Sequence, residues 1–273
     1  MIHIDPDKVS GYIREVAAEK ITPRFQNLLE SEVNSKTGPT DLVTIADLEA
    51  EVELTRVFKD LIPGSLVLGE EAVSQEETDI SLLGQEEGYV WVIDPVDGTN
   101  NFASGNEKFG TIVALAHGGE IVQAWILDIP KDRMAITEKG SGVELAGVCV
   151  SHPKLDQPLN EARGFISRKF LPPKMKEDLH DVLENEFGDI RTYMCCAHEY
   201  LEILSGDAYF SLYSRIRPWD HQAGGLMMRE AGGVVKKWDG SSYEAKDLRG
   251  GLICTPDQDT WDEIYGLLLN NYI

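Results

Sequence analysis

The sequence predicts a protein of mixed α and β structure, with an α+β first half and a second half of α/β character. Two β-rich runs, FGTIVALAH and IVQAWILDI, are joined by a glycine turn, which indicates an antiparallel hairpin at 109–129. In the second half, strand-like runs alternate with helical patterns instead. The 273 residues suffice for one large domain or two smaller ones. We therefore expect two halves, 1–150 and 151–273, packed as one compact unit.

Two helices are expected before the first strand. Apolar residues at helical spacing indicate a helix over 6–33. The polar turn NSKTGPTD follows, and a second helix is expected from about Leu48 to Leu61, where PGS ends it. These helices would cover one face of the sheet that the next strands form.

The remaining strands of the first half are short and apolar. Besides the hairpin, the expected strand regions are SLVLGEE (65–71), GYVWVID (88–94) and RMAITEKGSGVELAG (133–147). The first two of them end in acidic residues. A carboxylate at a strand end is held rigidly, so both ends are candidate functional positions.

The second half alternates strands with helices. The expected strands are 162–167, 207–213, 233–240 and 250–257, with a strand or turn at 191–195. The expected helices are 172–187, 197–206, 220–233 and 260–273. Glycines close the third of these helices, as they commonly do at helix C-termini.

Composition limits the partners of this chain. A net charge of -22 repels nucleic acid and anionic membranes, so neither is expected as a partner. No apolar run approaches the roughly 20 residues that span a bilayer, and the N-terminus lacks a signal-peptide pattern, so a cytoplasmic location is expected. The four cysteines form no C-x-x-C pair and are expected to be reduced core thiols. A phosphorylated substrate would also be repelled, unless bound cations reverse the local charge.

Carboxylates stand at the ends of expected elements in four places. They are Asp41 and Asp47 before the second helix, Glu70 with Glu71 and Asp94 with Asp97 at strand ends, and Asp220 at a helix start. Asp47 and Asp220 also suit helix N-caps, and Glu70 with Glu71 suits a solvated loop. Asp94 fits neither alternative, because it follows an apolar run typical of a strand buried on both faces. The carboxyl end of such a strand is where open α/β sheets place ligands.

The stretch WVIDPVDGTNNF (91–102) is compatible with two chemistries. Mg²⁺ requires oxygen ligands, and two such ions can share a carboxylate and clamp a phosphoryl group. Asp94, Asp97 and the Val96 carbonyl can face one pocket, and Gly98-Thr99 opens a helix whose free N–H groups suit a phosphate. The alternative is an aspartyl nucleophile of the haloacid-dehalogenase type. The spacing D-x-x-D-G-T is one residue longer than that motif, which favours metal binding.

Together these residues resemble the inositol monophosphatase family of Mg²⁺-dependent, lithium-sensitive sugar phosphatases. The matching stretches are Lys36 with DLVTIAD (41–47), GEE (69–71), WVIDPVDGTNNF, PWDHQAG (218–224), and EAGG with a following WDG. The resemblance covers nearly the whole chain. It implies a layered sandwich with alternating α-β-α-β-α layers, an active site between the two halves, and a homodimer.

The resemblance also implies the metal ligands. Glu70, Asp94 and the Val96 carbonyl would hold one Mg²⁺. Asp94, Asp97 and Asp220 would hold a second. Glu71 would help to bind a weaker third ion through water, so two or three Mg²⁺ are expected. These ions would make an anionic protein attractive to a phosphate.

For catalysis, the resemblance implies direct in-line attack by water, with no phosphoenzyme. Thr99 with Asp47 would orient and deprotonate that water. The backbone N–H groups of Gly98 and Thr99 would bind phosphate oxygens. Lys36 would add a positive charge nearby, although a lone loop lysine is also commonly just solvated.

The sequence departs from the family pattern where substrate choice is set. The usual R-x-x-G-S-A-A stretch has Met194 and Cys195 in place of its glycine and serine. The acidic residue that inositol phosphatases place seven before Asp220 is Tyr213 here, and Arg215 lies close by. The departure favours another polyol, or a substrate with a second anionic group, although the arginine also suits a solvated strand edge.

Several substrates therefore stay open. We expect a phosphomonoesterase acting on inositol monophosphate or a related sugar or polyol phosphate. Fructose 1,6-bisphosphate, 3′-phosphoadenosine 5′-phosphate and histidinol phosphate are alternatives with the same fold. A relative that binds metal without catalysis is an alternative of a different class, although Asp94, Asp97 and Thr99 are all present.

Overall fold

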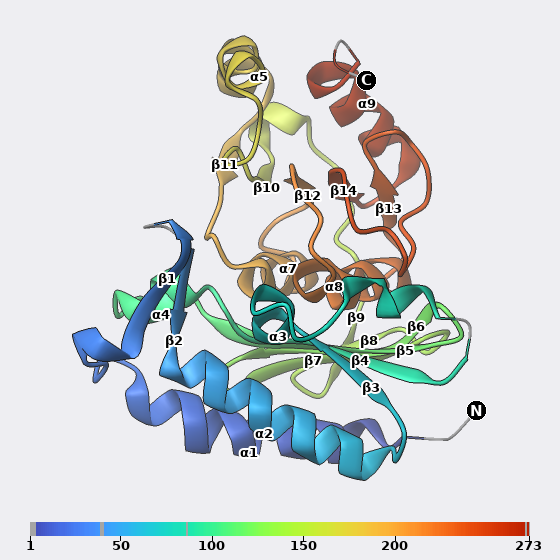
Figure 1. The fold of residues 1–273 in the computed structure, drawn as a ribbon. Helices are drawn as coiled ribbons and strands as arrows, with labels where there is room; N and C mark the ends of the chain where they lie inside the picture. Colours follow the sequence, from blue (N-terminus) through green and yellow to red (C-terminus); the bar gives the residue numbers. More distant parts are fainter. Residues whose placement is uncertain (1–3, 39–40, 86, 271, 273) are drawn as a thin grey trace.

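Two large β-sheets and the helices packed on them make up the protein (Figure 1). The computed structural model describes residues 4–38, 41–85, 87–270 and 272. One sheet has seven strands, the other has five, and a small two-stranded hairpin lies outside both. Helices lie below, between and above the two large sheets in the view of Figure 1.

The seven-stranded sheet is formed by residues 66–150. Its strands follow chain order and are β3 (Leu66–Gly69), β4 (Tyr89–Asp97), β5 (Gly110–His117), β6 (Glu120–Asp128), β7 (Arg133–Glu138), β8 (Val143–Leu145) and β9 (Val148–Val150). From β4 onward every neighbouring pair is antiparallel, which confirms the predicted hairpin and meander. The edge strand β3 is instead parallel to β4. The carboxyl ends of β3 and β4 therefore meet at one edge of the sheet.

The five-stranded sheet contains the strands of the second half. Its spatial order is β11 (Asp189–Arg191), β10 (Arg163–Ile166), β12 (Phe210–Tyr213), β14 (Leu252–Thr255) and β13 (Val234–Lys237). The first three strands run parallel, and the last two pair antiparallel. The segments that follow β10, β11 and β12 consequently leave the sheet at the same edge.

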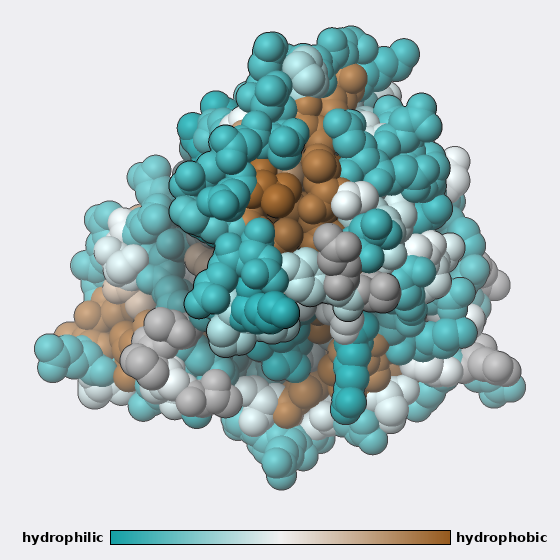
Figure 2. All heavy atoms as spheres, turned by 90° about the horizontal axis from the view of Figure 1, so that it is seen from above, coloured by the Kyte–Doolittle hydropathy of each residue, from teal (hydrophilic) through white to brown (hydrophobic). Residues whose placement is uncertain are grey.

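The helices form three layers around the two sheets, so the structure confirms the α-β-α-β-α sandwich (Figure 1). The lower layer holds α1 (Pro6–Val16) and α2 (Ile45–Leu61), and the central layer holds α7 (Cys196–Leu204) and α8 (Pro218–Glu230). The outer layer contains α5 (Pro173–Asp178), α6 (His180–Glu186) and α9 (Gln258–Leu268). Figure 2 looks down on this outer layer and shows apolar side chains gathered within a polar rim.

Helix α8 is buried on almost all sides because a sheet lies on each side of it. Ten of its thirteen residues are buried, and it contacts β6 of one sheet and β13 of the other. Such a helix has no solvent face for polar residues. The polar residue Asp220 in its first turn therefore stands out, and it faces the functional site described below.

The first predicted helix is too long. Helix α1 ends at Val16, a π-helical segment covers Ala17–Ile21, and a 3₁₀ turn covers Thr22–Arg24. Pro23 lacks the N–H group that a continuing helix would need. Further short 3₁₀ segments lie at Glu30–Glu32, Ile80–Gly84 and Leu159–Glu161.

The predicted polar turn NSKTGPTD is wrong in its described part, because it belongs to a hairpin. Strand β1 (Val33–Gly38) pairs antiparallel with β2 (Asp41–Thr44), while residues 39 and 40 lie outside the described part. Polar residues on both faces of β1 removed the alternation that marks a strand. The hairpin matters for function because it carries Lys36.

Two further helix predictions need adjustment. Leu179 interrupts the helix expected over 172–187 and separates α5 from α6, although hydrogen bonds from Leu179 to Met175 and from Leu183 to Leu179 bridge the interruption. The final helix, expected over 260–273, spans Gln258–Leu268, and residues 271 and 273 are outside the described part. No helix within the described residues is long and apolar enough to cross a membrane. The division of the chain at residue 150 stays a prediction.

Candidate active site

Two strand ends and two short helices form the floor of the site. Strand β3 leads into α3 (Glu70–Ser74), and β4 leads through Gly98 into α4 (Thr99–Ala103). Because β3 and β4 are parallel, both helices begin at the same edge of the sheet. Glu70 and Glu71 were expected to end a strand, but they form the first turn of α3. Their position beside the end of β4 is nevertheless as the acidic pattern predicts.

A β-bulge in β4 brings Asp94 and Asp97 to one side. Asp94 pairs with Ile112 and Asp97 with Gly110, so β4 has one residue more than β5 between these pairs. In a regular strand, residues three apart point to opposite faces. The extra residue shifts this alternation by one and turns both carboxylates into the same pocket. The Pro95 carbonyl inside the bulge accepts a 2.8 Å hydrogen bond from the Thr111 hydroxyl.

Asp220 joins this pair from α8. One carboxylate oxygen each of Asp94, Asp97 and Asp220 lies within 4.8 Å of the other two. Asp94 is buried, and its Oδ1 has no hydrogen-bond partner among the described residues. Burial, together with the charges of Glu70, Asp97 and Asp220, raises the pKa of Asp94 well above its usual value. A buried carboxylate cluster with an unpaired oxygen fits a divalent cation that prefers oxygen ligands.

The N-terminus of α7 supports Asp97. Its Oδ2 accepts hydrogen bonds from the Ala197 N–H at 2.5 Å and from the Cys195 thiol at 3.2 Å. Burial raises the pKa of Asp97 to about 7, although these two donors act in the opposite direction. Cys195, expected near the substrate, lines the pocket but directs its thiol at Asp97. Its role as a substrate contact stays a prediction.

Lys36 lies between the two glutamates of α3. Its Nζ is 3.0 Å from Glu70 Oε1 and 2.7 Å from Glu71 Oε1. Burial lowers the pKa of Lys36, but the charges of Glu70 and Glu71 outweigh it and raise the pKa above its usual value. Lys36 is therefore a charged partner of two predicted metal ligands, not a solvated loop lysine.

Glu51 is a functional candidate that the sequence reasoning missed. Its carboxylate accepts hydrogen bonds from the N–H groups of Glu71 and Ala72, both at 2.8 Å, and so caps α3 from the neighbouring helix α2. Gly69 permits this approach, because a Cβ there would lie 2.2 Å from the Glu51 carboxyl carbon. The available signal was its spacing of four residues from Asp47, which places both acids on one face of α2.

Asp47 and Thr99 are joined by a hydrogen bond beside the carboxylate cluster. Thr99 Oγ1 lies 3.1 Å from Asp47 Oδ1 and 3.0 Å from the Val96 carbonyl oxygen. Asp47 is not the N-cap of α2; that residue is Thr44, whose N–H and hydroxyl both donate to Asp47 Oδ2. Burial raises the pKa of Asp47 to about 6, against the hydrogen bonds from Thr44 and Thr99.

Gly98 is required by both its conformation and its surroundings. Its φ of 85° lies in the left-handed region, where glycine pays no steric penalty. A Cβ at this position would also lie 2.7 Å from the Lys108 carbonyl oxygen. Gly98 therefore lets β4 turn abruptly into α4, whose first N–H groups have no partner within the helix.

The pocket above this floor has a second wall, formed by the five-stranded sheet. The cavity of about 150 Å³ is lined on one side by Glu70, Asp97, Thr99 and Asp220, and on the other by Ser167, Lys169, Phe170, Thr192, Met194, Cys195, Cys196, Glu199, Tyr213 and Arg215. Tyr213 is buried in β12, and among the described residues its hydroxyl has no hydrogen-bond partner of good geometry. The structure thus brings every predicted site residue to this pocket or to the residues that support it.

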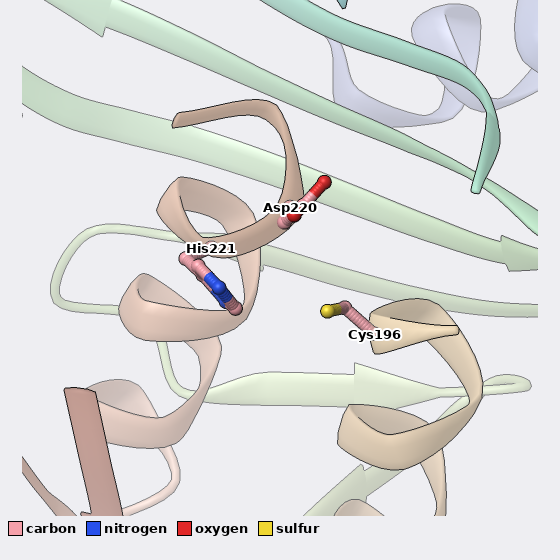
Figure 3. Close-up of side chains that lie close together, drawn as sticks. All are labelled: Cys196, Asp220 and His221. Carbon is pink, nitrogen blue, oxygen red and sulfur yellow. The ribbon is translucent and has the colours of Figure 1, made fainter. Parts of the chain in front are cut away.

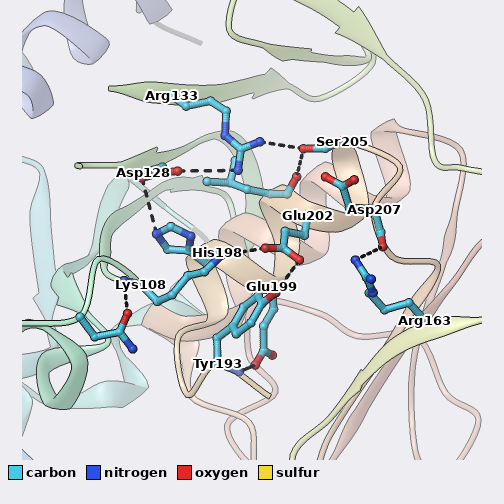
Figure 4. A network of polar contacts seen from close by, with 12 residues as sticks. Lys108, Asp128, Arg133, Arg163, Tyr193, His198, Glu199, Glu202, Ser205 and Asp207 are labelled. Atoms are coloured by element: carbon cyan, nitrogen blue, oxygen red, sulfur yellow. Dashed lines mark hydrogen bonds and ion pairs between the residues drawn. The ribbon is translucent and has the colours of Figure 1, made fainter. Parts of the chain in front are cut away.

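A network on α7 holds the loop after β11 (Figure 4). Glu199 Oε1 accepts hydrogen bonds from the Tyr193 N–H at 2.8 Å and from the Thr192 hydroxyl at 2.9 Å. Glu202 accepts hydrogen bonds from the Tyr193 hydroxyl and from Lys108 Nζ, both at 2.8 Å. Burial raises the pKa of Glu199 to about 7. These two acids were not singled out by the sequence, and they fix the loop that carries Met194.

Cys196 and His221 lie next to Asp220 and form a second group of potential metal ligands (Figure 3). The imidazole is already occupied, since Nδ1 lies 3.1 Å from the Tyr200 hydroxyl and Nε2 lies 3.1 Å from the Arg215 carbonyl oxygen. Burial lowers the pKa of His221 to about 4 and raises that of the Cys196 thiol. A neutral, doubly bonded histidine supports the start of α8 and is not free to ligate a metal.

Relatives of this chain carry the names of a phosphatase and of a Nus factor. The chain is 29% identical over 236 residues to the inositol-1-monophosphatase of Bacillus subtilis, covering 85% of this chain and 84% of the relative. It is 27% identical over 234 residues to the Nus factor SuhB of Vibrio cholerae, covering 83% and 82%.

Solved structures with the same fold include an IMPase of Thermotoga maritima. That structure is 25% identical, has a TM-score of 0.80, and covers 96% of this chain and 95% of its own. An IMPase/NADP phosphatase complexed with Mg²⁺ and phosphate has a TM-score of 0.81 at 18% identity, covering 97% and 95%. At the latter identity the likeness concerns the fold alone.

The fold and its relatives define the chain as a phosphomonoesterase. The sequence pattern of the inositol monophosphatase family matches residues 8–270. The chain belongs to that family, as its motifs predict.

Proposed function

We propose that this chain hydrolyses inositol monophosphate or a related sugar or polyol phosphate with the help of Mg²⁺. The observation that carries the proposal is the convergence of three carboxylates, Asp94, Asp97 and Asp220, next to the hydrogen-bonded pair of Thr99 and Asp47. The first group is a ligand set for a hard cation, and the second is a proton acceptor. A phosphate ester bound between them would meet both.

The metal ligands of the proposal are residues at the two strand ends and at the start of α8. Glu70, Asp94 and the Val96 carbonyl would hold one Mg²⁺, and Asp94, Asp97 and Asp220 a second. When bound, Mg²⁺ neutralises charge on the phosphoryl group and makes a nearby water more acidic. The elevated pKa of Asp97, about 7 with burial as its main cause, supports this assignment, because a cation would relieve the cost of the buried charge.

A third ion is expected to bind weakly, if at all. Lys36 already pairs with one oxygen of Glu70 and one of Glu71, and Glu71 is the residue proposed to help hold the third ion. Mg²⁺ at that position would compete with a buried ammonium group. We therefore propose two resident ions, with Lys36 supplying positive charge at the third position.

The proton of the attacking water would pass to Asp47 through Thr99. The Thr99 hydroxyl has one proton and two acceptors within 3.1 Å, the Val96 carbonyl and the Asp47 carboxylate. When the hydroxyl donates to Asp47, its lone pairs are free to accept from the water. The N–H groups of Gly98 and Thr99 would meanwhile orient the phosphate oxygens.

The leaving alcohol would lie against the wall that contains Tyr213 and Arg215. Fructose 1,6-bisphosphate, 3′-phosphoadenosine 5′-phosphate and histidinol phosphate remain alternative substrates for the same site. The homodimer that the resemblance implies stays a prediction, as does lithium sensitivity.

The test is phosphate release from a panel of sugar and polyol phosphates with Mg²⁺, with and without Li⁺ or EDTA. We expect release with at least one substrate, and loss of release when EDTA is added. A matched surface variant, Asp60→Asn, should behave like the wild type, since Asp60 is an exposed acid in the last turn of α2, at the opposite end of that helix from Asp47. Release that persists in EDTA would contradict the metal assignment, and no release from any substrate would contradict the proposed activity.

A role without hydrolysis is the competing hypothesis, and relatives named Nus factor SuhB keep it relevant. We favour hydrolysis because the carboxylates, Thr99 and Gly98 are all present and a pocket adjoins them. A protein that had lost catalysis would not need Thr99 held at 3.1 Å from a buried aspartate.

A further inference from the structure

Three parallel strand ends build the pocket wall that faces the carboxylates. The segment after β10 contributes Ser167, Lys169 and Phe170, the segment after β11 contributes Thr192 and Met194, and Arg215 follows β12. Carboxyl ends of parallel strands commonly carry the groups that select a ligand. The residues of this wall therefore indicate which chemical groups the leaving alcohol would carry.

The wall carries two cations beside one acid, Glu199, whereas the charged residues that line the floor are acids. Among the described residues that line the pocket, the lysine and arginine side chains are Lys169 and Arg215. Both lie in a protein with a net charge of -22, in which anions are otherwise repelled. Two cations on this wall favour an anionic group on the leaving alcohol.

Arg215 stacks on the Phe170 ring, and its charge is also attracted by Asp220, Asp41 and Glu70. Its guanidinium carbon lies 3.6 Å from the centroid of the Phe170 ring, which is a stacking distance. No carboxylate of the described residues lies within ion-pair distance of this guanidinium. Phe170 is 41% exposed and lines the pocket. The ring orients a guanidinium whose N–H groups remain available to an anion.

We propose that Arg215 and Lys169 form an anion subsite that binds a second acidic group, phosphate or carboxylate, on the phosphomonoester substrate. The inference rests on the proposed function, because it assigns the scissile phosphate to the acidic floor. The substrate class is then a phosphate ester that carries another anionic group on the alcohol. Phe170 is a positioning residue that holds Arg215 by stacking.

The alternative explanation is that Arg215 only balances the acidic floor. In that case its removal would impair all substrates by the same factor. An anion subsite instead distinguishes substrates, and a hydrogen-bonded charge contact corresponds to roughly tenfold to a hundredfold in binding. The two explanations therefore predict different ratios of kcat/KM between substrates with and without a second acidic group. This ratio does not depend on the overall activity.

The experiment compares matched substrates with and without a second acid. One pair is glycerol 3-phosphate and 3-phosphoglycerate, which adds a carboxylate, and the other is fructose 1-phosphate and fructose 1,6-bisphosphate, which adds a phosphate. For the wild type with Mg²⁺, we expect kcat/KM to be at least about tenfold higher for the more anionic member of one pair. The pair that shows the larger ratio identifies the second group.

Variants of the wall residues then test whether these residues cause the ratio of kcat/KM within a pair. Arg215→Ala and Lys169→Ala should each bring the ratio of kcat/KM towards one. The change should lie mainly in KM, because the lost contact binds the ground state and the transition state equally. Phe170→Leu keeps both charges but removes the stacking surface, so the ratio should fall only part of the way. Arg168→Ala is the control: this exposed arginine lies beside Lys169 but does not line the pocket, and its ratio should equal that of the wild type.

The outcomes separate the two proposals. Hydrolysis of the panel with equal kcat/KM within both pairs would overturn the anion subsite and leave the proposed function intact. An equal loss for both members of a pair in Arg215→Ala would also overturn it, in favour of charge balance. Absence of hydrolysis by the wild type for every phosphate ester would overturn the proposed function, and the subsite with it.

Discussion

The two walls of the pocket differ in how they are built and in how much water reaches them. Asp94 and Asp97 on the acidic floor are 2% and 7% exposed, and Phe170 and Met194 on the opposite wall are 41% and 40% exposed. The floor comes mainly from one stretch of twelve residues with a bulge, and the wall comes from three separate strand ends. Under the proposed roles, the reaction chemistry would depend on one local stretch, whereas selectivity would depend on several segments far apart in the chain.

The largest expected effect comes from the floor. Asp94→Asn should reduce phosphate release to background and weaken Mg²⁺ binding, because it removes the carboxylate shared by both proposed ions. Without metal, the same variant should be more stable than the wild type at pH 8. The ionised form of a carboxyl group with a raised pKa is costly in the fold, so the cost grows as pH rises.

The measurements for Asp94→Asn are phosphate release, isothermal titration with Mg²⁺, and urea unfolding in EDTA. Asp60→Asn serves as the control for loss of an exposed charge. Wild-type turnover by Asp94→Asn would remove the central argument for a metal-binding floor.

The next effect should come from Asp47 and Thr99, the proposed proton acceptor and the hydroxyl that leads to it. Asp47→Asn and Thr99→Ala should each lower kcat by roughly a hundredfold or more, the range typical of general-base loss. Because burial raises the pKa of Asp47 to about 6, wild-type activity should fall as pH drops through 6. Rates at saturating Mg²⁺ between pH 5 and 9 would show this limb, and Asp47→Asn should lack it. A limb retained by the variant would assign the titration to another group.

A smaller effect should come from Glu199, which holds the loop that carries Met194 on the wall opposite the acidic floor. Burial raises its pKa to about 7, above an ordinary value of 4.5, so the folded state is penalised as pH rises from about 4.5 to 7. Glu199→Gln keeps an acceptor for the Tyr193 N–H but carries no charge. The variant should gain about 1–3 kcal/mol in the free energy of unfolding at pH 8 and little at pH 4.

Urea unfolding at several pH values checks the prediction for Glu199. Glu186→Gln, an exposed acid on α6, should show no such dependence. If Glu199→Gln and the wild type kept a constant difference in stability across this range, the buried charge would not be the cause.

The smallest effect should come from Met194, which adopts a left-handed conformation with a φ of 54°. A side chain with a Cβ is strained there, and Met194 takes the place of the glycine usual in the family. Met194→Gly should raise the free energy of unfolding by about 1 kcal/mol, because relief of strain exceeds the added entropy of the unfolded chain. Ala146→Gly, at a φ of 50° far from the pocket, is the matched control and should gain a similar amount.

Substrate panels on the two glycine variants would sharpen the contrast between the walls. Only Met194→Gly should change the order of substrate preference, since Met194 lines the pocket and Ala146 does not. An unchanged order would separate the strain at Met194 from selectivity.

Much of the fold could be read from the sequence because its signals are local. The hairpin at 109–129 and the alternation of the second half appear as β5 and β6 and as the strands and helices of the five-stranded sheet. The first helix was predicted too long, since apolar spacing continued past Pro23. Strand β1 was missed because its polar residues show no alternation of polar and apolar side chains. The ion pairs of Lys36, which lies in this strand, were therefore missed as well.

By itself, the sequence determined the family and predicted most of the acidic floor, because WVIDPVDGTNNF places two acids, a carbonyl and a glycine turn within residues 94–98. Only the tertiary structure decided that Asp94 and Asp97 face the same way, since the bulge is set by pairing with β5. It also decided that Glu51 caps α3 and that Arg215 stacks on Phe170. Phe170 and Arg215 are 45 residues apart in the chain. They meet because the parallel strands that precede them end at a common edge of the sheet, and local spacing in the sequence does not show this.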